Sequence, residues 1–304
     1  MSRSDWQIEH LKAVAKRAGL EGSGITLPES HDVVVGRMRL HYLDWGGPAR
    51  PYLLFLHGGG LNAHTWDVIC LALRTRYHCL ALDLRGHGES EWSRDVTYSI
   101  DAYRADVEGF VDALEIDRFV LVGMSLGGLA ALAYAGANSG RLGGLVIIDT
   151  GPTTQTAGSA RVREFMQLPS ELDSVEAFVA RALEFNPSRD ASLLRSSLLH
   201  NLQEMPNGKW TWKYDPRYRT RDGFATVDEA RAKLWEVVPA IRCPTLVVRG
   251  GRSDVFSDLD AGGLAAKLPD GRWVVVPDAG HTVQGDNPRG LLDVMVQFLA
   301  PLEV

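Results

Sequence analysis

The sequence has few cysteines, no long apolar run and no surplus of positive charge. Only three of its 304 residues are cysteines, and their odd number and spacing match neither a disulfide framework nor a metal motif: Cys70, Cys79 and Cys243. We therefore expect free thiols, as in a reducing cytoplasm. No stretch approaches the roughly 18 consecutive apolar residues of a membrane span, and residues 1–20 lack the apolar segment of a secretory signal. These absences predict a cytoplasmic protein without a membrane partner.

The charge balance also restricts the partners. Lys and Arg total 32 against 38 Asp and Glu, which gives a net charge of −6. Such a chain has no cationic surplus for nucleic acid phosphates or for an anionic membrane surface. With 45% hydrophobic and 23% charged residues, the composition is that of a globular protein and excludes a disordered or collagen-like chain.

Short apolar runs closed by Gly, Asp or a polar residue recur along most of the chain. Runs of this kind are typical of strands buried on both faces of a parallel sheet: 51–58, 77–84, 118–125, 144–150, 244–250 and 272–278. Helical patterns separate them at 99–114, 126–137, 259–268 and 288–300. The alternation predicts a doubly wound α/β fold, with segments 32–36 and 37–45 forming an antiparallel hairpin at one edge.

Two parts of the chain lie outside this alternation. The first is an N-terminal extension, residues 1–30, for which we expect a short amphipathic helix with its apolar face formed by Ile8, Leu11, Val14, Ala15 and Ala18. The second is residues 152–238, an insertion too long for an ordinary loop, which we interpret as a helical cap. Within it, 209–216 alternates aromatic residues and predicts a short strand. The α/β core is then 31–151 and 239–304.

The run at 118–125 ends in a serine, within the sequence Gly123-Met124-Ser125-Leu126-Gly127. This is the G-x-S-x-G nucleophile elbow in its required context of strand, sharp turn and helix. A serine hydroxyl needs a base, and the base needs an orienting acid. Ligand sites in such sheets lie beyond the carboxyl ends of the strands, where His281 and Asp254 follow the last two runs. We predict the triad Ser125, Asp254 and His281, with Asp258, Asp260 and Asp149 as rival acids.

Two glycine-rich loops follow earlier strands. In His57-Gly58-Gly59-Gly60 we assign an oxyanion-hole N–H to Gly59, with Gly60 as the alternate, and the second N–H to Leu126. His57 precedes the turn, and we expect it to be structural. The loop from Asp83 to Ser90 lacks the pattern of a nucleotide-binding loop, and we interpret it as a turn held by Asp83 and Arg85.

These motifs together resemble the α/β-hydrolase superfamily, in its capped branch of esterases, lactonases, carbon–carbon bond hydrolases and epoxide hydrolases. The resemblance rests on LHGGG (56–60), ALDLRGHGES (81–90), VGMSLGG (122–128) and AGH (279–281), and it spans residues 32–300. It implies an eight-stranded, mostly parallel sheet with helices on both faces, acyl-enzyme chemistry and no cofactor. The sequence itself contains no metal motif.

Three departures narrow the branch. Epoxide hydrolases and haloalkane dehalogenases of this fold carry Asp at the elbow, where this chain has Ser125. Carbon–carbon bond hydrolases usually have Asn and Trp at the places of Gly123 and Thr282. Proline iminopeptidases resemble HGGPG at the first loop, whereas this chain reads HGGGL. A carboxylic ester or lactone hydrolase fits best.

We expect a small to medium, largely apolar ester or lactone as the substrate. Candidate pocket residues are apolar or aromatic: Met124, Phe165, Met166, Phe178, Phe185, Trp210 and Trp212. The alternatives are a carbon–carbon bond hydrolase acting on a dienoate ring-fission product, a cofactor-free haloperoxidase or perhydrolase, and a non-catalytic receptor on the same fold. We expect a monomer or a homodimer.

Overall fold

The fold is described from a computed structural model of the chain. It describes all residues except 1–2, 21–23, 47–50, 155, 188 and 303–304, so the parts of the predicted N-terminal extension at 1–2 and 21–23 lie outside the described residues. None of the described helices is long and apolar enough to cross a membrane.

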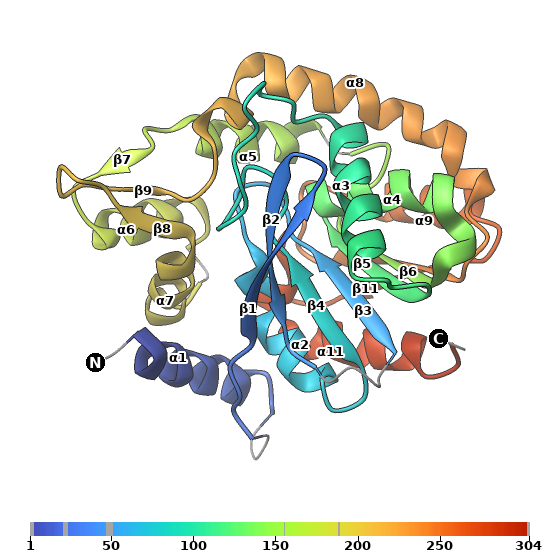
Figure 1. The fold of residues 1–304 in the computed structure, drawn as a ribbon, viewed down its shortest axis with the longest axis horizontal. Helices are drawn as coiled ribbons and strands as arrows, with labels where there is room; N and C mark the ends of the chain where they lie inside the picture. The colour runs from blue at the N-terminus through green and yellow to red at the C-terminus, as the bar shows by residue number, and fades with distance from the viewer. Residues whose placement is uncertain (1–2, 21–23, 47–50, 155, 188, 303–304) are drawn as a thin grey trace.

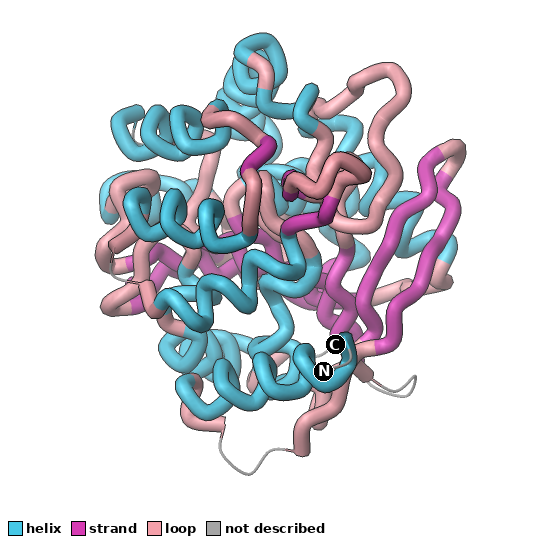
Figure 2. Tube along the Cα trace, turned by 90° about the vertical axis from the view of Figure 1, so that its left-hand side faces the viewer, coloured by secondary structure: helices cyan, strands magenta, loops and turns pink. Residues whose placement is uncertain are grey.

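An eight-stranded sheet runs through the centre of the molecule (Figure 1). Its strands, in spatial order, are β1 (Glu29–Val35), β2 (Met38–Asp44), β4 (His78–Leu82), β3 (Tyr52–Leu56), β5 (Phe119–Met124), β6 (Leu142–Ile148), β10 (Thr245–Gly250) and β11 (Gly271–Val276). The pairs β1–β2 and β2–β4 are antiparallel, and all other pairs are parallel. The predicted strands and the edge hairpin, which stands at the right of Figure 2, are therefore confirmed.

Alternating side chains of the central strands enter two separate apolar cores. In β3, Leu54 and Leu56 face one core, whereas Leu53 and Phe55 face the other. The first core is covered by α3 (Ile100–Ala113), α4 (Leu126–Asn138) and α9 (Asp258–Lys267). The second is covered by α1 (Arg3–Arg17), α2 (Asp67–Leu73) and α11 (Pro288–Leu299). Helices on both faces explain why these strands read as unbroken apolar runs.

The N-terminal helix α1 packs against α2 and against α7 (Ala191–Asn201). Leu11, Ala15 and Ala18, from the predicted apolar face, are each at most 2% exposed. Their burial follows from the helical spacing of apolar residues on a segment whose other residues are mostly charged or polar.

The insertion after β6, residues 152–238, is called the cap below, and it contains a small sheet as well as helices. Its elements are α5 (Thr156–Gln167), β7 (Glu171–Leu172), α6 (Val175–Phe185), α7, β8 (Leu202–Glu204), β9 (Trp210–Trp212), the 3₁₀ helix η3 (Pro216–Arg219) and α8 (Arg221–Val237). The three strands pair antiparallel in the order β7-β9-β8, and β9 is the strand predicted from the aromatic alternation. Figure 1 shows α6, α7 and this sheet to the left of the central sheet, with α8 running above α4.

Three 3₁₀ helices and one further short helix complete the described elements: η1 (Ala63–Trp66), η2 (Ser139–Arg141), η4 (Val238–Ala240) and α10 (Val283–Asp286). Two of them lie next to predicted site residues: η1 continues the loop after β3, and α10 follows His281. Gln284 in α10 donates a hydrogen bond to Thr65 in η1 at 3.0 Å, so the two loops are joined directly.

Candidate active site

Ser125 occupies a strained turn between β5 and α4. Its backbone has φ 51° and ψ −116°, a conformation that residues with a Cβ rarely adopt. A Cβ at Gly123 would collide with the backbone of Gly127, and one at Gly127 would collide with that of Leu56. The turn is tight because strand and helix pack closely, and it presents the serine at the N-terminus of α4, where the helix dipole favours negative charge.

His281 lies beyond β11, and its imidazole bridges Ser125 and a carboxylate. Nε2 is 3.1 Å from Oγ of Ser125, and Nδ1 is 2.8 Å from Oδ2 of Asp149. Both distances lie within hydrogen-bond range. Ser125 and His281 remain partly exposed, whereas Asp149 is fully buried. The arrangement joins nucleophile, base and acid in one chain of hydrogen bonds.

Asp149 is held by several donors besides His281. It follows β6 directly, with φ 52°, and its N–H donates to the Val248 carbonyl at 2.7 Å. Oδ1 accepts a hydrogen bond from the Gly250 N–H at 2.8 Å, and Oδ2 accepts one from the Ser253 hydroxyl. These bonds compensate for burying a charged group and fix the carboxylate toward the imidazole.

The prediction that Asp254 orients His281 is wrong. Asp254 is half exposed, and its carboxylate forms an ion pair with Arg161 at 2.6 Å. The residue before it, Ser253, turns inward to Asp149 instead. Both aspartates follow core strands, so the rule that places sites at strand ends admits each of them. Asp149 follows its strand directly, whereas Asp254 lies four residues after β10, where the loop has turned outward to Arg161.

The loop after β3 lies beside the nucleophile. A Cβ on Gly58 would lie 2.6 Å from Sδ of Met124 and 3.2 Å from Cβ of Ser125. A Cβ on Gly59 would lie 2.6 Å from the hydroxyl oxygen of Tyr218. The N–H of Gly127 donates to the His57 carbonyl at 3.0 Å and so ties the start of α4 to this loop. The loop is thus enclosed between the elbow and the cap.

His57 has the structural role that was predicted. It is fully buried, and burial lowers the pKa of its imidazole. Nε2 accepts a hydrogen bond from the Leu84 N–H at 3.0 Å, so Nδ1 carries the proton and donates to the Gly58 carbonyl at 2.8 Å. The imidazole therefore fixes the shape of the glycine loop.

The loop from Asp83 to Ser90 is a structural turn, as predicted. Asp83 accepts hydrogen bonds from the Ala63 and Glu89 N–H groups and from His41. Burial raises the pKa of Asp83, but the bond from His41 and nearby charges lower it on balance. Arg85 holds the other side of the turn through a bidentate ion pair with Asp106.

Two of the predicted pocket residues lie at the glycine loop. Met124 lies against Gly58, and the terminal methyl of Met166 would be 3.4 Å from a Cβ on Gly60. The others belong to the cap: Phe165 and Phe185 have ring centroids 4.7 Å apart, Phe178 packs edge-on against Trp212 at 4.8 Å, and Trp210 pairs within the cap sheet. Phe178 is fully buried and serves as cap core.

Two tyrosines of the cap complete a roof over the glycine loop. Tyr218 lies above Gly59, and Tyr214 lies 3.6 Å from a Cβ placed on Gly60. The sequence offered no signal for Tyr218, because its approach to Gly59 depends on how the cap folds back. Burial raises the pKa of Tyr218, so its hydroxyl stays protonated at neutral pH.

A groove of about 360 Å³ lies elsewhere on the cap, between the small sheet and Trp92. Trp212 and Tyr214 line it together with Met205, Pro206 and Pro216, whereas Ser125 and His281 do not. Trp212 therefore faces this groove.

The sequence is similar to those of known hydrolases over most of its length. A model of the alpha/beta hydrolase family matches residues 53–294. The esterase Rv0045c of Mycobacterium tuberculosis is 36% identical over 288 residues, which cover 92% of this chain and 91% of that protein. A 3-hydroxybutyrate-oligomer hydrolase of Cupriavidus necator is 28% identical over 257 residues, which cover 81% and 88%.

Solved structures show the same relationship. The M. tuberculosis esterase, in a structure from work on its transition metal inhibition, superposes with a TM-score of 0.76 and 33% identity over 95% of this chain and 97% of the other. An E-2-(acetamidomethylene)succinate hydrolase superposes with a TM-score of 0.79 and 25% identity over 90% and 99%.

Proposed function

The chain belongs to the alpha/beta hydrolase family, and we propose that it is a serine hydrolase cleaving a carboxylic ester or lactone through an acyl-enzyme on Ser125. The observation that carries the proposal is the hydrogen-bonded series from Ser125 through His281 to Asp149, with distances of 3.1 and 2.8 Å. The relationship to an esterase over nine-tenths of both chains supports the reaction class.

In the first step, Nε2 of His281 takes the proton of Ser125 as Oγ attacks the ester carbonyl carbon. The carbonyl oxygen becomes an anion. It is stabilised by the Gly59 N–H and by the Leu126 N–H at the start of α4. The tetrahedral intermediate then expels the alcohol, which takes its proton from His281. Asp149 holds the imidazole in the tautomer with the proton on Nδ1 and stabilises the cation that forms.

Water completes the cycle with the same groups. His281 removes a proton from water as the water attacks the acyl carbon. The same two N–H groups stabilise the oxyanion of the second tetrahedral intermediate. When the intermediate collapses, Ser125 leaves as the alcohol with the proton from His281, and the acid product is released.

The roof favours a small to medium, largely apolar substrate. Met124 and Met166 supply apolar surface on either side of the glycine loop, and Tyr214 and Tyr218 add aromatic surface from the cap. Buried apolar walls with a few polar tips are typical of small-molecule sites.

An ester panel tests the reaction class. We expect the purified wild type to hydrolyse p-nitrophenyl acetate, butyrate or octanoate, with the chain-length profile reporting the size of the roofed site. Ser125→Ala is expected to lose at least about 10³-fold in kcat. Ser197→Ala, an exposed serine on α7, is the matched control and keeps wild-type turnover. Equal turnover by Ser125→Ala and the wild type would refute the proposal.

The M. tuberculosis esterase has been studied for its transition metal inhibition. We propose that this chain shares that sensitivity and that ester turnover falls when a divalent transition metal is added.

A further inference from the structure

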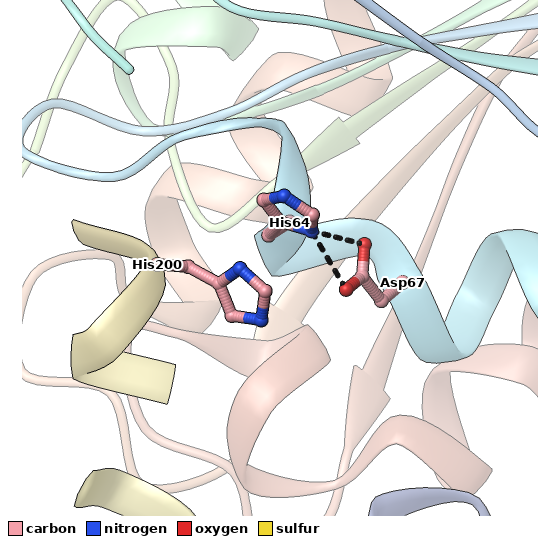
Figure 3. A group of neighbouring side chains, drawn as sticks. All are labelled: His64, Asp67 and His200. Atoms are coloured by element: carbon pink, nitrogen blue, oxygen red, sulfur yellow. Dashed lines mark hydrogen bonds and ion pairs between the residues drawn. The ribbon is translucent and has the colours of Figure 1, made fainter. Parts of the chain in front are cut away.

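Two histidines and an aspartate that the mechanism does not use lie together where the core meets the cap. His64 belongs to η1, Asp67 begins α2, and His200 lies near the end of α7 (Figure 3). Nδ1 of His64 is 2.9 and 3.2 Å from the two carboxylate oxygens of Asp67. The rings of His64 and His200 stack with their centroids 3.8 Å apart. Residues more than 130 positions apart in the sequence are thus in contact.

The donor atoms are close enough to share one ion. One ligand atom from each residue lies within 4.8 Å of the others. Metal–ligand bonds of about 2.0–2.2 Å place tetrahedral ligands roughly 3.4 Å apart, so the His200 ring must turn out of its stack with His64 to join the pair. Two imidazoles and a carboxylate suit zinc, nickel, copper and cobalt, whereas calcium and magnesium prefer oxygen ligands only.

The surroundings restrict the side chains and exclude most solvent. His200 is 5% exposed, and the side chains of His64 and Asp67 are 19% and 12% exposed. Trp6 of α1 packs on His200 with ring centroids 4.8 Å apart, and His10 lies 5.9 Å from the same ring. Nδ1 of His10 is buried and makes no hydrogen bond to any described residue, which leaves another nitrogen donor beside the cluster.

We propose that His64, Asp67 and His200 bind one divalent transition metal ion, which ties cap helix α7 to the loop that carries Gly59. Asn62 in that loop already donates a hydrogen bond to the His200 carbonyl at 2.8 Å. Thr65 is joined to Gln284, three residues after His281. An ion at this seam restrains the cap relative to the glycine loop and the histidine loop together.

Metal binding itself does not depend on the proposed hydrolase activity. The expected fall in turnover does rest on that activity, because a restrained cap slows substrate entry and product release. Binding and turnover are therefore measured separately, so that failure of one is distinguishable from failure of the other.

The test uses untagged full-length protein stripped with EDTA and titrated with ZnCl₂ by calorimetry, with Co²⁺ absorption as a second probe. We expect one ion per chain in the wild type. His200→Gln and Asp67→Asn are expected to bind at least tenfold more weakly and to lose the ligand-field bands of bound Co²⁺. His31→Gln, an exposed histidine on β1 paired with Glu29, is the matched control and binds like the wild type.

Each outcome decides the matter. Equal binding by the wild type and both variants would place the ion elsewhere and overturn the site, as would absence of wild-type binding below millimolar zinc. If His200→Gln does not fold by circular dichroism, Asp67→Asn, which preserves side-chain size, decides in its place. Inhibition of turnover by zinc in the wild type but not in a folded, active variant supports the restraint of the cap. Equal inhibition in both assigns the effect to another group and refutes that part.

Discussion

Replacing Asp149 by asparagine separates the two candidate acids. The carboxylate accepts hydrogen bonds from His281, Ser253 and the Gly250 N–H, and it is fully buried. In Asp149→Asn, the amide NH₂ can donate to Nδ1 of His281 and so places the imidazole proton on Nε2. A protonated Nε2 cannot accept the proton of Ser125.

The expected loss follows from that change of tautomer. In a serine triad the same substitution lowers kcat about 10⁴-fold, so we expect Asp149→Asn to lose about 10³- to 10⁴-fold in kcat. KM should change little, because Asp149 has no exposed surface with which to contact substrate. The amide NH₂ that replaces Oδ2 cannot accept the hydrogen bond of the Ser253 hydroxyl. Loss of this bond also lowers the free energy of unfolding by about 1–3 kcal/mol.

The assay compares Asp149→Asn with Asp254→Asn on the same ester. Asp254 pairs with Arg161 at the surface, whereas His281 is hydrogen-bonded to Asp149, so we expect less than a threefold change in kcat for Asp254→Asn. Thermal unfolding of each variant is the control, since the folded fraction must be equal at the assay temperature. An Asp149→Asn enzyme with more than a tenth of wild-type activity, or an Asp254→Asn enzyme with the larger loss, would refute the assignment.

Three further predictions follow from the same contacts. Ser253→Ala removes one donor to Asp149, and we expect a three- to tenfold lower kcat with unchanged KM in steady-state assays. Gly59→Ala places a Cβ against the hydroxyl of Tyr218 and displaces the glycine loop, so we expect about a 10- to 100-fold lower kcat. The double variant that adds Tyr218→Phe should recover part of this kcat. A double variant no better than the single one would argue against this contact. Burial lowers the pKa of His87 to about 3. Below pH 6.5 the unfolded chain therefore binds a proton that the folded chain does not. As the pH falls from 6.5 to 3, the free energy of unfolding decreases by up to about 1.4 kcal/mol per pH unit. Denaturant unfolding between pH 7 and 5 should show a shallower fall in His87→Gln, and an unchanged slope would contradict this account.

The central sheet and the elbow could be predicted because their signals are local. Apolar runs with sharp ends mark strands covered on both faces, and the Ser125 turn requires glycines two residues before and after it. His281 was found because one histidine follows the last strand of the sheet. In each case a few neighbouring residues are sufficient for the prediction.

The acid and the roof depend on contacts between distant segments. Asp149 directly follows the last residue of β6, whereas Asp254 lies four residues after β10, at a point where the loop has already turned outward. That difference was a usable signal, and it favoured Asp149. The approach of Tyr218 to Gly59 and that of His200 to His64 have no sequence signal, because each depends on how the cap closes on the core.

Mapping of a covalent adduct tests the central claim most directly. The purified wild type, Ser125→Ala and Asp149→Asn are treated with a fluorophosphonate probe, then analysed by intact mass and peptide mapping. The account predicts one adduct per wild-type chain, located on Ser125, no adduct in Ser125→Ala, and much slower labelling of Asp149→Asn. An adduct at another residue, or no adduct on a folded wild-type protein that hydrolyses esters, would contradict Ser125 as the nucleophile.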